Sequence, residues 1–410
     1  MFTQKAPLIM KKFAVALTGL ILITILSACS DSISPPKLSG PWLPGATSFE
    51  LHKGDKWMQI RAWYPSKEES ENKLLSSDEH TISAFSELIG LPEFLMGSED
   101  VSRSNLEVET ADGKFPVLIF NHGLMSYARQ NMSQFEQLAS NGYVVLSLAN
   151  PGDSMVVVRG NGEVVIPGED SVAYQALEKQ KEDSEELAPQ LQHDIAKIKT
   201  SKDFAEFSEN MKVLAENPVF APMSSIFNSV LENNLLLIDS LDAIQEGKIK
   251  TALAGHLDLN NIGAYGHSFG AIMSGLLGMG NPQVKAIVGM DAPQLNLGNI
   301  NYKPLSIPAC YVYADELNYA DEIIKFNKIN QPLLKQPGSC EALFKESAHY
   351  NFTDLNLVPP LRYSPMLGDV DNALMASNLE TLLLSFFDTH LKQKNNMQRL
   401  SLQEVELTIY

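Results

Sequence analysis

A serine between two glycines is the side chain of this sequence best placed to do chemistry. The motif Gly266-His267-Ser268-Phe269-Gly270 follows the apolar run 261–265 and precedes a run of small residues, 271–280. In the pattern Gly-x-Ser-x-Gly, a sharp strand-to-helix turn lifts the serine hydroxyl out of the fold, and strand and helix come too close for a Cβ at the glycines. The helix N-terminus that follows favours an anion. The motif predicts that Ser268 is a nucleophile, unless it is a chance pentapeptide in an ordinary turn.

The base for such a serine is usually a histidine that a carboxylate orients. In α/β-hydrolases the order along the chain is serine, acid, histidine. Of the eight histidines, only His349 and His390 follow Ser268. His390 falls near the end of a predicted terminal helix, where a capping or solvated role is expected. His349 comes just after the last predicted strand, and we predict that it is the base.

Two carboxylates compete for the role of the acid. Asp291 directly follows the apolar run 284–290, and Asp315 directly follows the run 310–314. Both therefore stand at the carboxyl end of a predicted strand. Asp291 would alternatively cap a helix, and Asp315 would alternatively be a surface turn residue. The pattern alone leaves the two open.

When a serine attacks a carbonyl group, the carbonyl oxygen becomes an oxyanion that two backbone N–H groups must stabilise. One is predicted to be that of Phe269, directly after the serine. The other is expected in the loop after an earlier strand, and His122-Gly123-Leu124-Met125 follows the apolar run 117–121. Leu124 is the candidate, the alternative being an ordinary turn at the end of a strand.

The elements that must position these residues alternate between strand and helix. An alternating segment, 57–64, predicts a half-buried strand. Continuous apolar runs predict buried strands at 117–121, 143–149, 261–265, 284–290, 310–314 and 342–345, with helices at 132–140 and 372–391. This order is typical of an α/β-hydrolase fold, a mostly parallel sheet flanked by helices. From about 152 to 256 the sequence is charged and helical, which predicts a cap insertion over the carboxyl ends of the strands.

Several motifs together resemble those of the platelet-activating-factor acetylhydrolases of the secreted type. They are Asn121-His122-Gly123-Leu124, the serine motif, Met290-Asp291-Ala292 and His349-Tyr350-Asn351-Phe352, joined by 61–65 and by the terminal helix with Phe386, Phe387 and Leu391. The resemblance spans about 50–393, with gaps at 66–110 and 155–255. It implies that the acid follows the strand after the serine helix, which favours Asp291 over Asp315.

The resemblance also implies a function. It implies a serine esterase of short-acyl carboxylic esters, acetylhydrolase or phospholipase A2-like, that acts on a small-molecule or lipid ester without a cofactor. The alternatives are a polyester- or triglyceride-cleaving enzyme, a dienelactone-hydrolase-like enzyme, or a non-catalytic lipoprotein that binds ligands.

The N-terminus predicts export and a lipid anchor. Met10-Lys11-Lys12 is followed by an apolar run, 13–26, that is too short for a comfortable membrane span. Leu26-Ser27-Ala28-Cys29 resembles a bacterial lipobox, which predicts lipidation of Cys29 and membrane attachment by acyl chains. A plain signal peptide with an incidental cysteine is the alternative. Ser30 after the cysteine favours the outer membrane.

The boundaries and the remaining composition complete these predictions. We expect a signal peptide at 1–28, a tether at 29–47, the hydrolase domain at 48–393 and a tail at 394–410. The net charge is −18 without a Lys/Arg cluster, so nucleic acid is not an expected partner. Cys310 and Cys340 stand near the starts of neighbouring predicted strands, as a disulfide or as two buried thiols. Neither C-x-x-C nor H-E-x-x-H appears, so no metal is expected.

Overall fold

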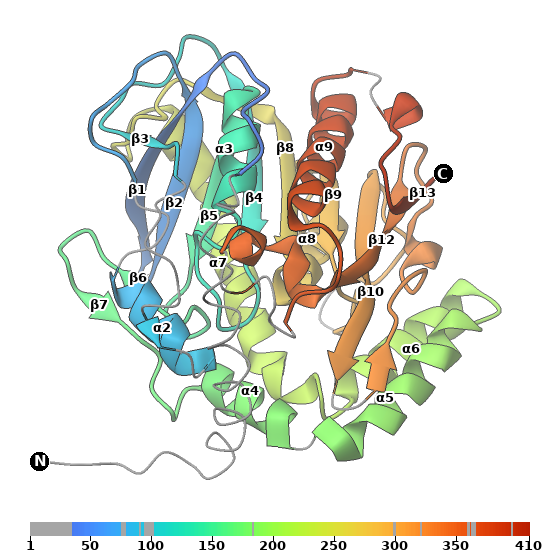
Figure 1. Ribbon diagram of the computed structural model, residues 1–410. Coiled ribbons are helices and arrows are strands. Elements are labelled where there is room, and N and C mark those ends of the chain that lie inside the picture. The colour runs from blue at the N-terminus through green and yellow to red at the C-terminus, as the bar shows by residue number, and fades with distance from the viewer. Residues whose placement is uncertain are drawn as a thin grey trace, which may run out of the picture.

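One large sheet with helices on both faces organises the molecule (Figure 1). The computed structural model describes residues 35–74, 79–89, 92–93, 102–182, 184–297, 301–319, 322–358, 361, 366–394 and 397–410. Within them the sheet has 11 strands in the order β13-β12-β10-β9-β8-β4-β5-β2-β1-β3, with β11 paired to β10. The strands are β1 (Leu43–Lys53), β2 (Lys56–Ser66), β3 (Asn105–Leu106), β4 (Phe115–Asn121), β5 (Val144–Ala149), β8 (Leu257–His267), β9 (Val284–Met290), β10 (Ala309–Tyr319), β11 (Glu322–Ile324), β12 (Cys340–Ala348) and β13 (Val405–Ile409).

The centre of the sheet is parallel, antiparallel pairs flank it on both sides, and the short edge strand β3 pairs in parallel with β1. Strands β5, β4, β8, β9, β10 and β12 pair in parallel, whereas β1 with β2, β2 with β5, and β12 with β13 pair antiparallel. Parallel strands are buried on both faces, which is why they stand out in the sequence as continuous apolar runs. The α/β-hydrolase fold predicted from the sequence is confirmed.

The helices cover the two faces of the sheet. They are α2 (Glu79–Ile89), α3 (Met132–Ser140), α4 (Val172–Glu182), α5 (Ser184–Lys199), α6 (Phe204–Glu216), α7 (Ser224–Gln245), α8 (Phe269–Gly280) and α9 (Asn372–Leu391). In Figure 1, α3 and α9 lie on the near face, and α7 and α8 lie on the far face. Alternate residues of β4 serve both cores: Ile119 packs with α7 and α8, and Phe120 packs with α3 and α9.

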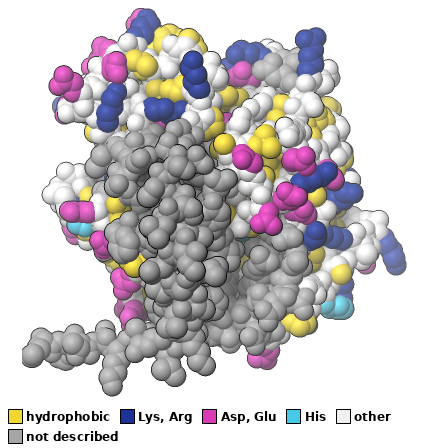
Figure 2. Space-filling model, viewed as in Figure 1, with side chains coloured by type: hydrophobic (Ala, Val, Ile, Leu, Met, Phe, Trp, Pro, Cys, Tyr) yellow, Lys and Arg dark blue, Asp and Glu magenta, His cyan; other side chains and the backbone are white. Residues whose placement is uncertain are grey.

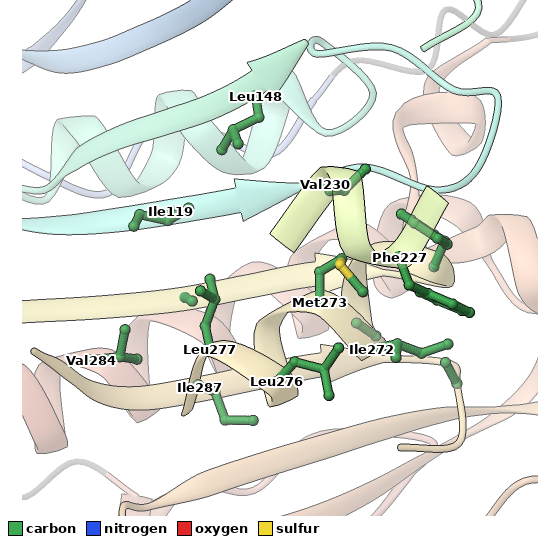
Figure 3. Close-up of a cluster of buried hydrophobic side chains, with 14 of the residues drawn as sticks. Ile119, Leu148, Phe227, Val230, Ile272, Met273, Leu276, Leu277, Val284 and Ile287 are labelled. Atoms are coloured by element: carbon green, nitrogen blue, oxygen red, sulfur yellow. The ribbon is translucent and has the colours of Figure 1, made fainter. Parts of the chain in front are cut away.

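Figure 3 shows the core between the sheet and the α7–α8 layer. Leu148 and Ile119 reach it from β5 and β4, and Phe227 and Val230 reach it from α7. Burial of these side chains fixes α8 against the sheet. Because α8 begins directly after Ser268, this core also fixes the position of the serine.

The predicted cap insertion divides into two parts. A small hairpin, β6 (Val157–Val158) with β7 (Val164–Val165), and helices α4 to α6 depart from the sheet. Helices α4 to α6 lie at the end toward which the arrow of β10 points (Figure 1). Helix α7 instead belongs to the layer that covers the sheet, because its buried stripe of Phe227, Val230, Leu237 and Leu241 joins the main core.

Both ends of the expected domain are corrected by the structure. The predicted tether, 29–47, overlaps β1, which pairs with β2 from Leu43 onward. The predicted tail, 394–410, contains β13, which pairs antiparallel with β12. Pro44 and Gly45 suggested a linker, and the five residues of β13 form a half-exposed edge strand whose apolar pattern is short. The domain therefore includes β1 from Leu43 onward and β13, Val405–Ile409.

Cys310 and Cys340 are opposite each other in the parallel pair β10–β12 and are joined by a disulfide. Of the two alternatives that the sequence left open, the structure contains the bonded one.

Cys29 and the rest of the predicted leader lie outside the described residues. Within the described ranges, no helix combines the length and the apolar character needed to cross a membrane. On the face in Figure 2, basic side chains are scattered among acidic and uncharged ones.

Candidate active site

Ser268 occupies a strained turn between β8 and α8. Its φ is 56° and its ψ is −121°, a backbone region that non-glycine residues seldom adopt. Its N–H donates to Met290 O at 2.8 Å, which ties the turn to the end of β9. A Cβ at Gly266 would lie 2.3 Å from Gly270 O, and one at Gly270 would lie 1.9 Å from Asn121 O. The two glycines are therefore required by the close approach of the strand, the helix and the end of β4.

Asp291 and His349 meet at the carboxyl ends of β9 and β12. His349 Nδ1 lies 2.6 Å from Asp291 Oδ2. Asp291 is 2% exposed, and its other oxygen accepts the N–H of Ala314 at 2.9 Å. Its own N–H donates to Val312 O at 2.8 Å. Strand β10 thus holds the Asp291 carboxylate in a single orientation, with one oxygen directed at His349.

The two alternatives to these residues lie elsewhere. Asp315 accepts hydrogen bonds from Lys325 Nζ at 3.1 Å and from Glu346 N at 3.2 Å. His390 Nε2 lies 3.1 Å from Gly338 O, just before β12 begins and so at the opposite end of that strand from His349. The structure therefore brings His349 together with Asp291 and not with Asp315.

The loop after β4 lies directly against the serine. A Cβ on Gly123 would be 3.6 Å from Ser268 Cβ. The Gly123 N–H donates to Gln130 Oε1 at 3.0 Å, and the Met125 N–H donates to Asp153 O at 2.8 Å. Between them the N–H of Leu124 has no acceptor within the described part of the chain, and the same holds for that of Phe269. Two N–H groups without a described acceptor thus lie in the segments next to Ser268.

His122 holds this loop in shape. Its Nδ1–H donates to Gly123 O at 2.7 Å, and its Nε2 accepts from Ser154 Oγ at 2.7 Å. Burial lowers the pKa of His122 to about 4, so the ring is neutral at physiological pH. His122 is therefore part of the framework of the loop.

His267 and Gln130 are site residues that the sequence analysis missed. His267 Nε2 lies 2.9 Å from His349 O, and its Nδ1 lies 3.0 Å from Gln130 Nε2. The His267 ring lies 4.5 Å from the His349 ring, centroid to centroid. Burial, reinforced by His349, lowers the pKa of His267 well below its usual value. The serine motif does mark position 267, but no local pattern marks Gln130.

Residues at the N-terminus of α3 form hydrogen bonds with the loop that carries His349. Asn131 Nδ2 donates to Phe352 O at 2.6 Å. The backbone N–H of Ser133 donates to Asp354 Oδ2 at 2.8 Å, and its hydroxyl donates to Oδ1 at 2.5 Å. These bonds join the turn His349–Phe352 and Asp354 to the N-terminus of α3, which restricts the movement of the loop that carries His349.

Helix α7 packs beside the turn that carries Ser268. Phe227 stacks on Phe269 with ring centroids 4.9 Å apart and an angle of 11° between the planes. Asn234 and Asn121 exchange two side-chain hydrogen bonds, at 2.8 and 3.0 Å. No group of three or more His, Cys, Asp or Glu side chains in the described ranges is arranged to hold a metal ion.

Comparisons with known proteins agree on an esterase framework. The sequence profile of the family described as platelet-activating factor acetylhydrolase, isoform II, matches residues 27–407. The platelet-activating factor acetylhydrolase of Canis lupus familiaris is 21% identical over 368 residues, covering 87% of this chain and 77% of the relative. That of Cavia porcellus is 21% identical over 378 residues, covering 89% and 79%. The structure of a ferulic acid esterase from Streptomyces cinnamoneus superposes with a TM-score of 0.60 at 14% identity, covering 92% of this chain and all of the other.

Proposed function

The chain belongs to the platelet-activating factor acetylhydrolase isoform II family and is a carboxylic ester hydrolase, and on that premise we propose that Ser268, His349 and Asp291 carry out the hydrolysis. The observation that carries the proposal is the 2.6 Å contact between His349 Nδ1 and Asp291 Oδ2. The His349 ring lies beside the ring of His267, which directly precedes Ser268 in its strained turn. A buried carboxylate keeps the imidazole proton on Nδ1, which leaves Nε2 free to accept the serine proton.

The reaction proceeds in two halves. Ser268 Oγ attacks the ester carbonyl while His349 Nε2 takes its proton, and the carbonyl oxygen becomes an oxyanion. The N–H groups of Leu124 and Phe269 hold that oxyanion, and the N-terminus of α8 adds a favourable dipole. His349 then protonates the departing alcohol, which leaves an acyl group on Ser268. Water, deprotonated by His349, attacks the acyl group and releases the carboxylic acid. The reaction needs no cofactor.

The substrate is proposed to be an ester with a short acyl group, as in an acetylhydrolase or a phospholipase A2-like enzyme. Support comes from the relatives, which are named as platelet-activating factor acetylhydrolases. The leaving group would be a lysophospholipid or a simple alcohol. Rates measured on p-nitrophenyl esters, short- and long-chain phospholipids, triglycerides and a polyester will test this. Preference for the last two substrates would contradict it.

We also propose that the enzyme is an exported bacterial lipoprotein, lipidated at Cys29 and held at the outer membrane. The lipobox-like sequence Leu26-Ser27-Ala28-Cys29 supports the anchor, and Ser30 supports the outer membrane. A hydrolase attached in this way would meet esters at or near a lipid surface.

Ser268→Ala tests the nucleophile. Loss of the hydroxyl removes no core packing, so we expect normal folding with ester hydrolysis reduced by about three orders of magnitude or more. Labelling by a fluorophosphonate probe should also disappear. Ser274→Ala is the matched control, because Ser274 is a buried serine of α8 whose hydroxyl donates only to Gly270 O, at 2.9 Å. Activity above a few per cent in the Ser268 variant would exclude Ser268 as the nucleophile.

A further inference from the structure

Gln130 makes contacts with two separate loops of the site through one side-chain amide. It is 5% exposed and lies just before α3. Its Oε1 accepts the N–H of Gly123 at 3.0 Å, and its Nε2 faces His267 Nδ1 at 3.0 Å and Asn131 Oδ1 at 2.9 Å. The backbone N–H of Gly123 only donates, so the amide oxygen must face it and the NH2 must face His267.

This orientation fixes the protonation of the His267 ring. Nδ1 accepts from Gln130, so the ring proton of the neutral imidazole must be on Nε2. That proton is directed at His349 O, 2.9 Å away. The opposite tautomer would place the Nε2 lone pair against the carbonyl oxygen, which is unfavourable in a buried site. Gln130 and the His349 carbonyl therefore select the same tautomer from opposite sides of the His267 ring.

The main chain of Gln130 makes a third connection. Its carbonyl accepts the N–H of Asp354 at 3.0 Å, just beyond the turn that carries His349. The neighbouring Asn131 donates to Phe352 O at 2.6 Å. Gln130 thus contacts the loop of Gly123 and Leu124 on one side and the loop of His349 on the other.

We propose that Gln130 is a positioning residue that, through the tautomer of His267, holds the Leu124 loop and the His349 loop in register around Ser268. The inference rests on the proposed function, since it concerns the alignment of the same three groups. Gln130 touches none of the reacting atoms; it acts through Gly123 and His267. Displacing a catalytic group by about 1 Å lowers the rate about 100-fold, so a bond that sets this alignment should appear in kcat.

Gln130→Met is the first test. Methionine has a similar volume but can neither accept from Gly123 nor donate to His267. We expect kcat on p-nitrophenyl acetate to fall about 10- to 100-fold while KM changes less than about twofold, because substrate contacts remain and alignment is lost. The matched control is Gln137→Met. Gln137 is also 5% exposed and lies in α3, but it bonds to Ser39 and Glu380, and its loss should leave kcat unchanged.

Gln130→Glu tests the role of Gln130 through the pH dependence of kcat, which a purely structural role would leave unchanged. The introduced carboxyl still accepts from Gly123, and at low pH one proton shared with His267 Nδ1 replaces the amide N–H. As pH rises that proton is lost, and two acceptors then oppose each other. Within the described ranges, the titratable side chains with rings against His267 are His349 and Tyr350, and Asp291 is bonded to His349. We expect the ratio of variant to wild-type kcat to approach one near pH 6 and to fall steadily toward pH 9. The ratio for Gln130→Met should stay flat.

The outcomes separate this inference from the proposed function. If Ser268→Ala remains active, the proposed function fails, yet nitrogen-15 NMR of the labelled histidines still tests whether His267 carries its proton on Nε2. If Ser268→Ala is inactive but Gln130→Met keeps wild-type kcat, only the role of Gln130 fails. A ratio for Gln130→Glu that does not change with pH would also overturn it. If Gln130→Met does not fold, the pH series on Gln130→Glu decides alone.

Discussion

Asp291 presents its two carboxylate oxygens to two different donors, and this determines what an amide at that position would do. One oxygen accepts the Ala314 N–H at 2.9 Å and the other faces His349 Nδ1 at 2.6 Å. In Asp291→Asn, the amide oxygen must stay with Ala314, so the NH2 group turns toward His349. The imidazole then carries its proton on Nε2 and cannot accept the serine proton. We expect kcat to fall about 10⁴-fold with folding intact.

Asp315→Asn is the control for this prediction. Asp315 bonds to Lys325 and to the N–H of Glu346. Its amide variant should therefore keep nearly full activity in the same p-nitrophenyl acetate assay. If the two effects were reversed, the acid would be Asp315, and the assignment of Asp291 from the family resemblance and the geometry would be wrong.

Residues differ in how far the sequence reveals their roles. Ser268 is marked by a local motif, and His349 by its position after the serine. Asp291 and Asp315 share the same local pattern, and only the family resemblance favoured one before their contacts were known. Gln130 carries no signal, since its partner His267 lies 137 residues away and their contact depends on how three loops meet. Polar contacts between loops arise from tertiary structure and leave no periodic pattern.

Helices and strands also differ in how well the sequence predicts them. Helices at 132–140 and 372–391 and the strand at 284–290 begin and end where their apolar patterns predicted. β1 and β13 were missed because each lies toward an edge of the sheet, where half of the side chains face solvent and the apolar signal is short. Helix α7 was expected only as part of the cap insertion, because its place in the sheet layer depends on packing against α8. Burial on both faces therefore made an element predictable.

The packing of α9 on α3 includes a carboxyl group that makes stability depend on pH. Glu380 is 3% exposed, and its Oε2 accepts from Gln137 Nε2 at 2.9 Å. Burial raises the pKa of Glu380 from 4.5 to about 8, although Arg103 opposes the rise. Between these values the folded protein keeps a proton that the unfolded chain has lost. The free energy of unfolding therefore falls as pH rises through this range.

Glu380→Gln should remove this part of the pH dependence. We expect the variant to match the wild type near pH 5 and to exceed its free energy of unfolding by about 1–3 kcal/mol at pH 8. Asp354, whose pKa burial raises to about 7, keeps part of the slope. Urea unfolding at both pH values measures the difference, with Glu209→Gln on the exposed face of α6 as control. Equal stability of variant and wild type at pH 8 would show that Glu380 is ionised in the folded protein.

At the scale of the whole molecule, the first described residues already contact the rest of the domain. Arg103 donates to Pro36 O, and the Ser39 N–H donates to Gln137 Oε1 at 2.9 Å. The opposite edge of the sheet is completed by β13. The contacts that define the site lie between Asn121 and Asp354. Folding and catalysis should therefore be independent of the proposed acyl anchor at Cys29.

Cys29→Ser tests that independence together with the proposed anchor. Without the thiol no acyl chain can be added, and each buried CH₂ of such a chain contributes about 0.8 kcal/mol to membrane attachment. We expect the variant to leave the membrane fraction while its kcat on a soluble ester equals that of the parent. Fractionation of cells that express parent or variant, with an ester assay on each fraction, measures both. Variant protein that still sediments with membranes in high salt would refute attachment through Cys29. Loss of soluble-ester activity in a folded variant would show that the anchor does more than localise the enzyme.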